Sequence, residues 1–135
     1  MKITICRKAH FNAAHKLYNP NLSNEDNFEI FGKCSYENFH GHNYELIVKI
    51  LGDINPKTGM VMDLSDLKKI IKTEVEDLLD HKNLNLDIPH FKDTIPTTEN
   101  LAIFIWNKLN SAIKLDCELS IVLYETPRNY VEYSG

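Results

Sequence analysis

Three histidines on two segments with strand-like alternation are the residues of this sequence best placed to do chemistry. His40 and His42 are separated by a single glycine, and residues two apart on a strand point to the same face. Their imidazoles can therefore bind one metal ion. His15, at the end of another alternating segment, would complete the His₃ set of catalytic zinc sites, in which water or substrate takes the fourth position. An ordinary pair of packed or surface histidines is the alternative for an isolated His-x-His.

A cysteine close to this pair is a candidate base. Cys34 lies six residues before His40, which would bring its sulfur near a substrate held at the metal. A neighbouring metal and imidazole favour the thiolate, which can remove a proton. A buried cysteine that only fills space is the alternative.

Two acidic positions also allow a functional interpretation. Asp80-His81 follows a helical pattern, where it is either a solvated helix end or a carboxylate and imidazole that exchange protons near neutral pH. Glu125 continues the apolar face of a strand-like segment. A carboxylate there needs a partner, either a lysine or arginine or a ligand edge with two adjacent N–H donors.

Alternating segments predict the strands that position these residues. Residues 2–15 alternate with period two and end in His15, and 40–51 alternate with His40 and His42 on one face. The turn residues of GDINPKTG, followed by MVMDL, predict a hairpin over 40–64 with its tip near 56–59. The polar segment 16–33 is expected to be a long surface loop.

Helical spacing of apolar residues appears in the second half of the chain. Residues 64–79 form one amphipathic pattern behind Asp63 or Ser65 as N-cap, and 98–113 form another behind Thr97 or Thr98. The segment between them is expected to be a loop, and ELSIVLYET and NYVEY are expected to be terminal strands. This order predicts an α+β fold with a mostly antiparallel sheet and helices on one face.

Composition restricts the class of protein. The chain has 135 residues, 43% of them hydrophobic, which fits one domain over 1–135. A net charge of -4 with scattered basic residues argues against a nucleic-acid partner, and the N-terminus lacks the apolar run of a signal or a membrane span. The odd set of cysteines indicates a reducing compartment, and therefore the cytoplasm. Cys6 and Cys117 lie in strand patterns and are expected in the core.

Several motifs together resemble the 6-pyruvoyl-tetrahydropterin synthase family, which also includes 6-carboxy-tetrahydropterin synthases. The resemblance covers most of the chain and rests on FGKC at 31–34, HGHNY at 40–44, TGMVMDL at 58–64, DHKNLNLD at 80–87, TTEN at 97–100 and YET at 124–126. Their order and spacing are far more specific than any one of them. The resemblance implies the tunnelling fold, a four-stranded antiparallel sheet backed by two helices, in subunits that form trimeric barrels and pair into hexamers with active sites between subunits.

The resemblance also implies a role for each candidate residue. Zn²⁺ is bound by the three histidines, Cys34 abstracts the proton, and Asp80 and His81 complete its relay. Glu125 anchors the pterin ring, and Thr98 and Glu99 line the same pocket. The implied reaction converts 7,8-dihydroneopterin triphosphate to 6-pyruvoyl-tetrahydropterin with loss of triphosphate and without a redox cofactor.

One residue departs from the pattern of the animal members. Glu37 stands three residues before His40, where it is either a second base or a solvated loop residue. In a variant subgroup, a glutamate at this spacing is associated with side-chain cleavage to 6-hydroxymethyl-dihydropterin for folate synthesis. The queuosine-pathway relatives, which make 6-carboxy-tetrahydropterin, usually have three residues between the cysteine and HGH, whereas five intervene here. A zinc-stabilised binding domain, with Cys34 as fourth ligand, is the non-enzymatic alternative.

Overall fold

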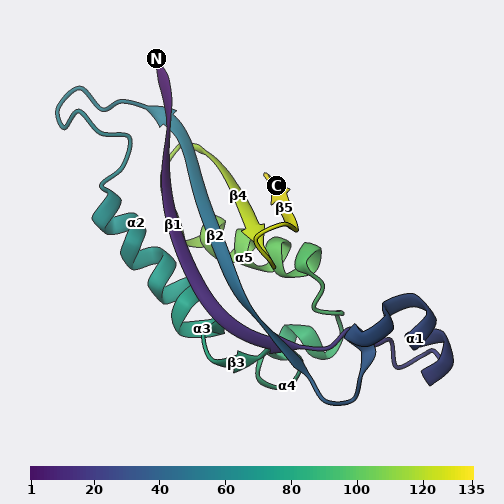
Figure 1. The fold of residues 1–135 in the computed structure, drawn as a ribbon. Coiled ribbons are helices and arrows are strands. Elements are labelled where there is room, and N and C mark those ends of the chain that lie inside the picture. The colour runs from purple at the N-terminus through teal and green to yellow at the C-terminus, as the bar shows by residue number, and fades with distance from the viewer.

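Two long strands form the centre of the fold. In the computed structural model, which describes all 135 residues, β1 (Lys2–His15) and β2 (His40–Asp53) pair antiparallel over their whole length (Figure 1). The register runs from Lys2 opposite Asp53 to His15 opposite His40. Both predicted strands are confirmed.

The sheet has one strand more than expected. Its order is β3-β1-β2-β4-β5, and β4 (Glu118–Tyr124) and β5 (Tyr130–Tyr133) extend it antiparallel beside β2. On the other side, β3 (Lys82–Asn83) pairs in parallel with β1. The prediction of four antiparallel strands was therefore wrong, because β3 is a fifth strand and pairs in parallel. Its two residues are too few to show the alternation by which a strand is predicted.

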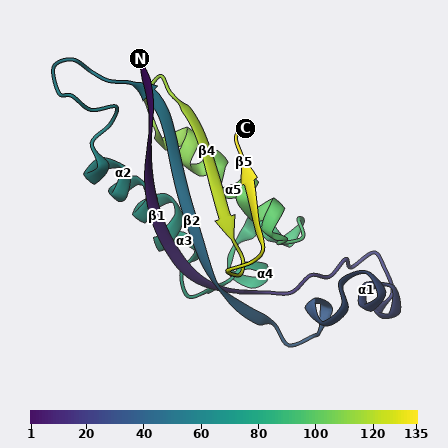
Figure 2. The same cartoon turned by 45° about the horizontal axis from the view of Figure 1, so that its top comes forward.

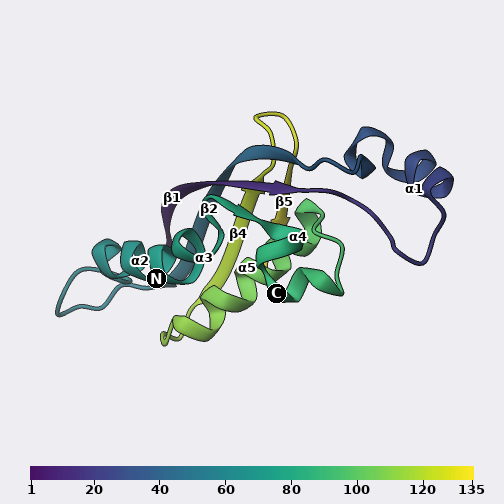
Figure 3. The same ribbon diagram turned by 90° about the horizontal axis from the view of Figure 1, so that it is seen from below.

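The two predicted helices lie on one face of the sheet, as expected (Figure 3). The first is continuous from α2 (Leu64–Ile71) through the π-helical η2 (Lys72–Glu76) to α3 (Asp77–Leu79). The second is α5 (Thr98–Ala112). Each begins at a side-chain cap, Asp63 Oδ1 accepting from the Ser65 N–H and Thr97 Oγ1 from the Asn100 N–H.

The core fills the space between this face and the helices. Odd residues of β1 and even residues of β2 point inward because the strands pair in register. They meet apolar residues that recur every three or four positions along the helices. Fully buried members include Phe11, Tyr44, Leu46, Ile50, Leu67, Leu79, Leu101, Ile105, Leu109, Ile121 and Leu123.

The segment expected to be a long loop contains a helix. α1 (Asn24–Phe31), capped by Ser23, is followed by the 3₁₀ turn η1 (Gly32–Ser35). In Figures 1 and 2 this arm projects beyond the ends of β1 and β2. The helix escaped prediction because its only buried residue is polar: Asn27 is fully buried, so no apolar stripe marks the inner face.

Two further expectations were wrong in detail. MVMDL does not form the second arm of a hairpin, because only the bridge between Asn55 and Met60 remains and the chain then turns into α2. The predicted loop before α5 contains α4 (Leu84–Asp87) and the 3₁₀ turn η3 (Pro89–Lys92) as well as β3. Cys6 is exposed on the bare face of β1, and Cys117 is half-buried just before β4. None of the helices combines the length with the apolar composition that a membrane span requires.

Candidate metal and substrate site

The strand register explains why the three histidines meet. His15 lies directly opposite His40, and Ala13 lies opposite His42, so all three imidazoles extend from the same face at one end of the β1–β2 pair. One nitrogen from each ring can be chosen so that the three lie within 4.8 Å of one another. His15 is fully buried and the other two are partly buried. The predicted histidine cluster therefore exists in the structure.

The free atoms of this cluster suit a metal ion. His15 Nδ1 lies 2.8 Å from the carbonyl oxygen of Pro96, so this nitrogen carries the proton and donates. The hydroxyl of Tyr44 lies 3.4 Å from the same nitrogen. His15 Nε2 and His42 Nε2 are buried without any hydrogen-bond partner. Unpaired buried nitrogens are costly, and a metal ion would satisfy both.

Electrostatics keeps the cluster in the form that a metal requires. Burial lowers the pKa of His15, with a smaller contribution from the neighbouring His40. Burial and then His42 lower the pKa of His40. Metal ligation requires the neutral imidazole, so both shifts favour binding. The donor set of three imidazoles is one that zinc commonly uses.

Glu125 lies beside the histidines, immediately after β4. Its Oε2 accepts a hydrogen bond of 2.6 Å from Thr98 Oγ1, at the start of α5. The same carboxylate lies 3.9 Å from His15 Nε2 and 3.9 Å from His42 Nε2. No lysine or arginine pairs with it, so a salt bridge does not explain the acidic residue on this face. The carboxylate remains available to a ligand.

A cavity of about 470 Å³ opens in front of Glu125. Thr98 and Glu99 line it, as the resemblance implies, together with Arg128 and Asn129 from the turn between β4 and β5. Neither turn residue was predicted, because the sequence there shows only turn chemistry. One molecule bound in this cavity could therefore contact the carboxylate of Glu125, the hydroxyl of Thr98 and the guanidinium of Arg128.

Asp80 and His81 lie at the opposite edge of the sheet and are held by Asn12. The backbone N–H of Asn12 donates to Asp80 Oδ1 at 2.8 Å, and the His81 N–H donates to the Asn12 carbonyl at 2.7 Å. His81 has a φ of 61°, which is uncommon for a residue other than glycine. Its Nδ1 lies 2.9 Å from Asp80 Oδ2 while 82% of its side chain is exposed. The dipeptide is therefore an oriented pair and not a loose helix end.

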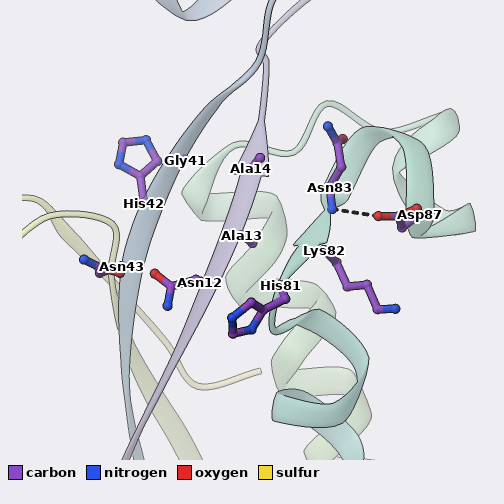
Figure 4. A pocket seen from close by; sticks show the side chains of 10 residues that line it. All are labelled: Asn12, Ala13, Ala14, Gly41, His42, Asn43, His81, Lys82, Asn83 and Asp87. Carbon is purple, nitrogen blue, oxygen red and sulfur yellow. Dashed lines mark hydrogen bonds between the residues drawn. The ribbon is translucent and has the colours of Figure 1, made fainter.

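This pair borders a second cavity, of about 540 Å³, shown in Figure 4. Asn12, Gly41 and Asn43 contribute to it from β1 and β2. In the view of Figure 4 the two strands run between the His81 and His42 rings. The backbone bond from Asn12 holds the pKa of Asp80 below its usual value, and His81 adds to this effect. Asp80 is consequently a carboxylate near neutral pH, able to support a charged imidazole.

Cys34 and Glu37 are on the arm. Cys34 is half-buried in η1, and its carbonyl accepts a 2.7 Å hydrogen bond from the Leu17 N–H. Glu37 is exposed and borders a cavity that contains no member of the histidine cluster. No hydrogen bond joins Cys34 to Asp80 or His81 within one chain. A single subunit thus unites the histidines with Glu125 and Thr98 but leaves the predicted base and its relay unconnected.

Sequence reasoning missed two groups that support the cluster. Tyr44 shares the parity of His40 and His42, so its position on their face was readable, but nothing pointed to a hydroxyl facing His15. The Pro96 contact is made by a backbone carbonyl. No side-chain pattern could have indicated it, because it depends on how the loop before α5 packs over β1.

Comparisons with known proteins identify the family of the chain. The family model for 6-pyruvoyl tetrahydropterin synthase matches residues 4–135. The 6-pyruvoyl tetrahydrobiopterin synthase of Pongo abelii is 47% identical over 131 residues, covering 97% of this chain and 90% of the relative. The 6-carboxy-5,6,7,8-tetrahydropterin synthase of Haemophilus influenzae is 37% identical over 122 residues, covering 76% of this chain and 84% of the relative.

A solved structure extends the likeness to the whole fold. The 6-pyruvoyl tetrahydropterin synthase of Caenorhabditis elegans superposes with a TM-score of 0.93 at 41% identity, covering 100% of this chain and 96% of that one. Sequence model, relatives and structure agree over nearly the full length. This chain belongs to the 6-pyruvoyl tetrahydropterin synthase family of enzymes.

Proposed function

We propose that this protein converts 7,8-dihydroneopterin triphosphate to 6-pyruvoyl-tetrahydropterin, as a zinc-dependent lyase. One observation carries the proposal: the unpartnered Nε2 atoms of His15 and His42 face the carboxylate of Glu125, beside a cavity that would accommodate a pterin. The names of the relatives support a pterin substrate. The spacing of five residues between Cys34 and the HGH motif favours the pyruvoyl product over the 6-carboxy product.

The three histidines would hold zinc through one ring nitrogen each. Zinc bound there would act as a Lewis acid on the side-chain oxygens of the substrate and so acidify the adjacent C–H bonds. The Pro96 carbonyl keeps the proton of His15 on Nδ1 and so leaves Nε2 unprotonated. The partial burial of the cluster would limit the access of bulk water.

Glu125 would recognise the pterin ring. A carboxylate can accept two parallel N–H bonds from a guanidine-like edge, a geometry that is both strong and selective. The Thr98 hydroxyl, which donates to Oε2, fixes the orientation of the carboxylate. Glu99 borders the same cavity. This arrangement would orient the side chain of the substrate toward the histidines.

Cys34 would remove the proton, and Asp80 with His81 would accept and return it. The structure supports a shared site, because one chain does not join these groups whereas a neighbouring subunit could. We therefore propose a homohexamer, a dimer of trimeric barrels, with each active site between subunits. Heterologous contacts that close into a ring repeat such a site identically. The three free thiols support a cytoplasmic location.

Product analysis by mass spectrometry tests the proposal. Zinc-loaded protein is incubated with 7,8-dihydroneopterin triphosphate beside Cys34→Ala and Glu37→Ala. We expect triphosphate loss and a pyruvoyl product that depends on Cys34 and not on Glu37. A 6-hydroxymethyl product that depends on Glu37, or a 6-carboxy product, would contradict the assignment.

A chelation experiment separates an enzyme from a zinc-stabilised binding domain. Removal of the metal from an enzyme of this kind should leave a folded, inactive oligomer, because the apolar core of this structure contains none of the three histidines. A domain held together by zinc would instead unfold. Circular dichroism and sedimentation before and after chelation, with Cys34→Ala tested for retained zinc, distinguish the two.

A further inference from the structure

The four residues after β1, Lys16–Asn19, have no regular secondary structure but are held at both ends by asparagine side chains. We name this segment the strap. The Lys16 N–H donates to Asn85 Oδ1 at 2.9 Å, and Asn85 Nδ2 donates to the Lys16 carbonyl at 3.1 Å. Asn27 holds Asn19 in the same manner, accepting from its N–H at 2.6 Å and donating to its carbonyl at 2.9 Å. Each side-chain amide thus bonds both the N–H and the carbonyl of one strap residue, as the backbone of a neighbouring strand would.

Between these two supports the strap is bonded to the backbone of Cys34. The Leu17 N–H donates to the Cys34 carbonyl at 2.7 Å. Lys16 and Leu17 directly follow His15, so one residue separates the metal ligand from this bond. The path of the chain through Lys16 therefore helps to fix the position of η1 relative to the histidine cluster.

A second contact joins the strap to Phe39, the residue before β2. The ammonium of Lys16 lies 5.3 Å from the centre of the Tyr18 ring and 5.3 Å from that of Phe39, within the range of a cation–π contact. Phe39 directly precedes His40. The strap is thus attached to α4, to η1 and to the residue before the second metal ligand.

We infer that Asn85 is a positioning residue, which holds Lys16 so that the Cys34 thiol keeps its place relative to the histidine cluster. The inference rests on the proposed function of Cys34. Neither backbone group of Lys16 has another partner, so loss of the amide frees the chain at the point where β1 ends. Proton abstraction depends steeply on the placement of the base, and a misplacement of about 1 Å can cost roughly a hundredfold in rate.

Two variants at this position test the inference. Asn85→Ala removes both bonds to Lys16, whereas Asn85→Asp keeps an acceptor for the Lys16 N–H. We expect kcat of Asn85→Ala to fall roughly ten- to a hundredfold with KM changed by less than about threefold. Asn85→Asp should recover most of the lost kcat. Zinc affinity, measured by competition with a chromophoric chelator, should stay within about threefold in both variants, because the ligands and the Pro96 contact are untouched.

Asp63→Ala is a matched control, since it also removes one short polar side chain that accepts a backbone N–H, at the start of α2. It should lower Tm as much as Asn85→Ala does and leave kcat unchanged. Amide hydrogen exchange gives a direct readout that needs no turnover. The Leu17 amide should exchange faster in Asn85→Ala, and not in Asp63→Ala.

The outcomes separate this inference from the proposed function. Unchanged Leu17 exchange and unchanged kcat in Asn85→Ala would overturn the positioning role, while Cys34→Ala still tests the base. A loss of kcat that parallels Tm equally in both variants would also overturn it, since general destabilisation would then suffice. Full activity of Cys34→Ala would instead remove the proposed base, whatever Asn85 does.

Discussion

The two regions of the predicted active site, the histidine cluster and the Asp80-His81 pair, are built in different ways. The histidine cluster lies at the edge of the core, where His15 is fully buried and contacts Pro96 and Tyr44. Asp80 and His81 lie on the surface, held to Asn12 by backbone hydrogen bonds, with the His81 ring exposed. The cluster is complete in one chain, whereas the pair presents its imidazole outward.

This difference indicates which parts of the site a subunit can assemble alone. The proposed metal and pterin sites use groups that the strand register and the start of α5 bring together. The proposed proton relay uses Asp80 and His81, and the exposed ring of His81 suits a surface that another subunit covers. Metal binding should consequently be insensitive to changes at Asp80 or His81, and turnover should be sensitive to both regions.

The largest expected effect is the loss of metal on removal of a buried ligand. His15→Ala should lower zinc affinity at least about a hundredfold, because each ligand of a tetrahedral site carries on the order of 3 kcal/mol of the binding free energy. Chelator competition measures the affinity. His81→Ala is the matched control from the exposed pair and should bind zinc normally. Equal losses in the two variants would contradict the division between the regions.

Mixed oligomers sharpen the comparison further. Cys34→Ala and His81→Ala should each be inactive alone. If these residues meet between subunits, a fraction of the sites in mixed oligomers has both wild-type groups, roughly a quarter at equal mixing. Denaturing and refolding the two variants together, then assaying turnover, should restore activity that separate refolding does not. Activity that stays absent would place both groups of each site in one subunit.

Substrate recognition should respond less strongly. Glu125→Gln replaces the charged acceptor, and loss of a charge-assisted hydrogen bond costs about 1.5–3 kcal/mol. The expected result is a decrease in kcat/KM of roughly ten- to a hundredfold. Thr98→Val, which removes only the bond to Glu125, should cost about 1 kcal/mol. A larger effect from Thr98 than from Glu125 would contradict the role of the carboxylate as anchor.

Most of the core end of the site could be predicted from the sequence. Period-two alternation placed His15, His40 and His42 on inward faces, and the observed register of β1 against β2 then brings their imidazoles together. Parity alone did not indicate that Pro96 would cover His15, because the loop before α5 carries no periodic signal. The alternation pattern correctly placed residues whose burial follows from their position on a strand, and it gave no information on contacts made by loops.

The surface end was harder to predict, for a physical reason. Asp80-His81 is held by the backbone of Asn12, and a backbone group has no sequence signature. β3 has two residues, too few to alternate, and α1 hides a buried asparagine where an apolar residue would normally mark the inner face. Local hydrogen bonds of polar groups determine the conformation of these segments. Many sequences can form such bonds, so the sequence pattern does not reveal them.

A smaller effect is expected from the support of His15. Tyr44→Phe removes a hydroxyl that lies 3.4 Å from His15 Nδ1, and the stacking on Phe11, with ring centres 5.0 Å apart, should persist. The Pro96 contact remains, so zinc affinity should fall by less than about tenfold, at the lower end of the range for outer-shell partners. A change as large as that of His15→Ala would show that Tyr44, and not Pro96, orients the ring.

The pH dependence of stability provides a final test that needs no substrate. Burial lowers the pKa of His15 and His40 from the ordinary value of 6.5, so between the lowered values and 6.5 the unfolded chain binds more protons than the folded one. Stability of the metal-free protein is therefore fully present above pH 6.5 and is lost as the pH falls below it. The buried His15 accounts for most of this loss, up to about 1.4 kcal/mol per pH unit, and His40 contributes less because solvent screens its partly exposed ring. Urea unfolding of chelated protein from pH 8 to pH 5 measures this slope. His15→Gln should make it shallower. Asp80, whose pKa is lowered from 3.8, contributes only at lower pH and does not affect this range. A slope that His15→Gln leaves unchanged would show that the titration of His15 does not cause the loss of stability.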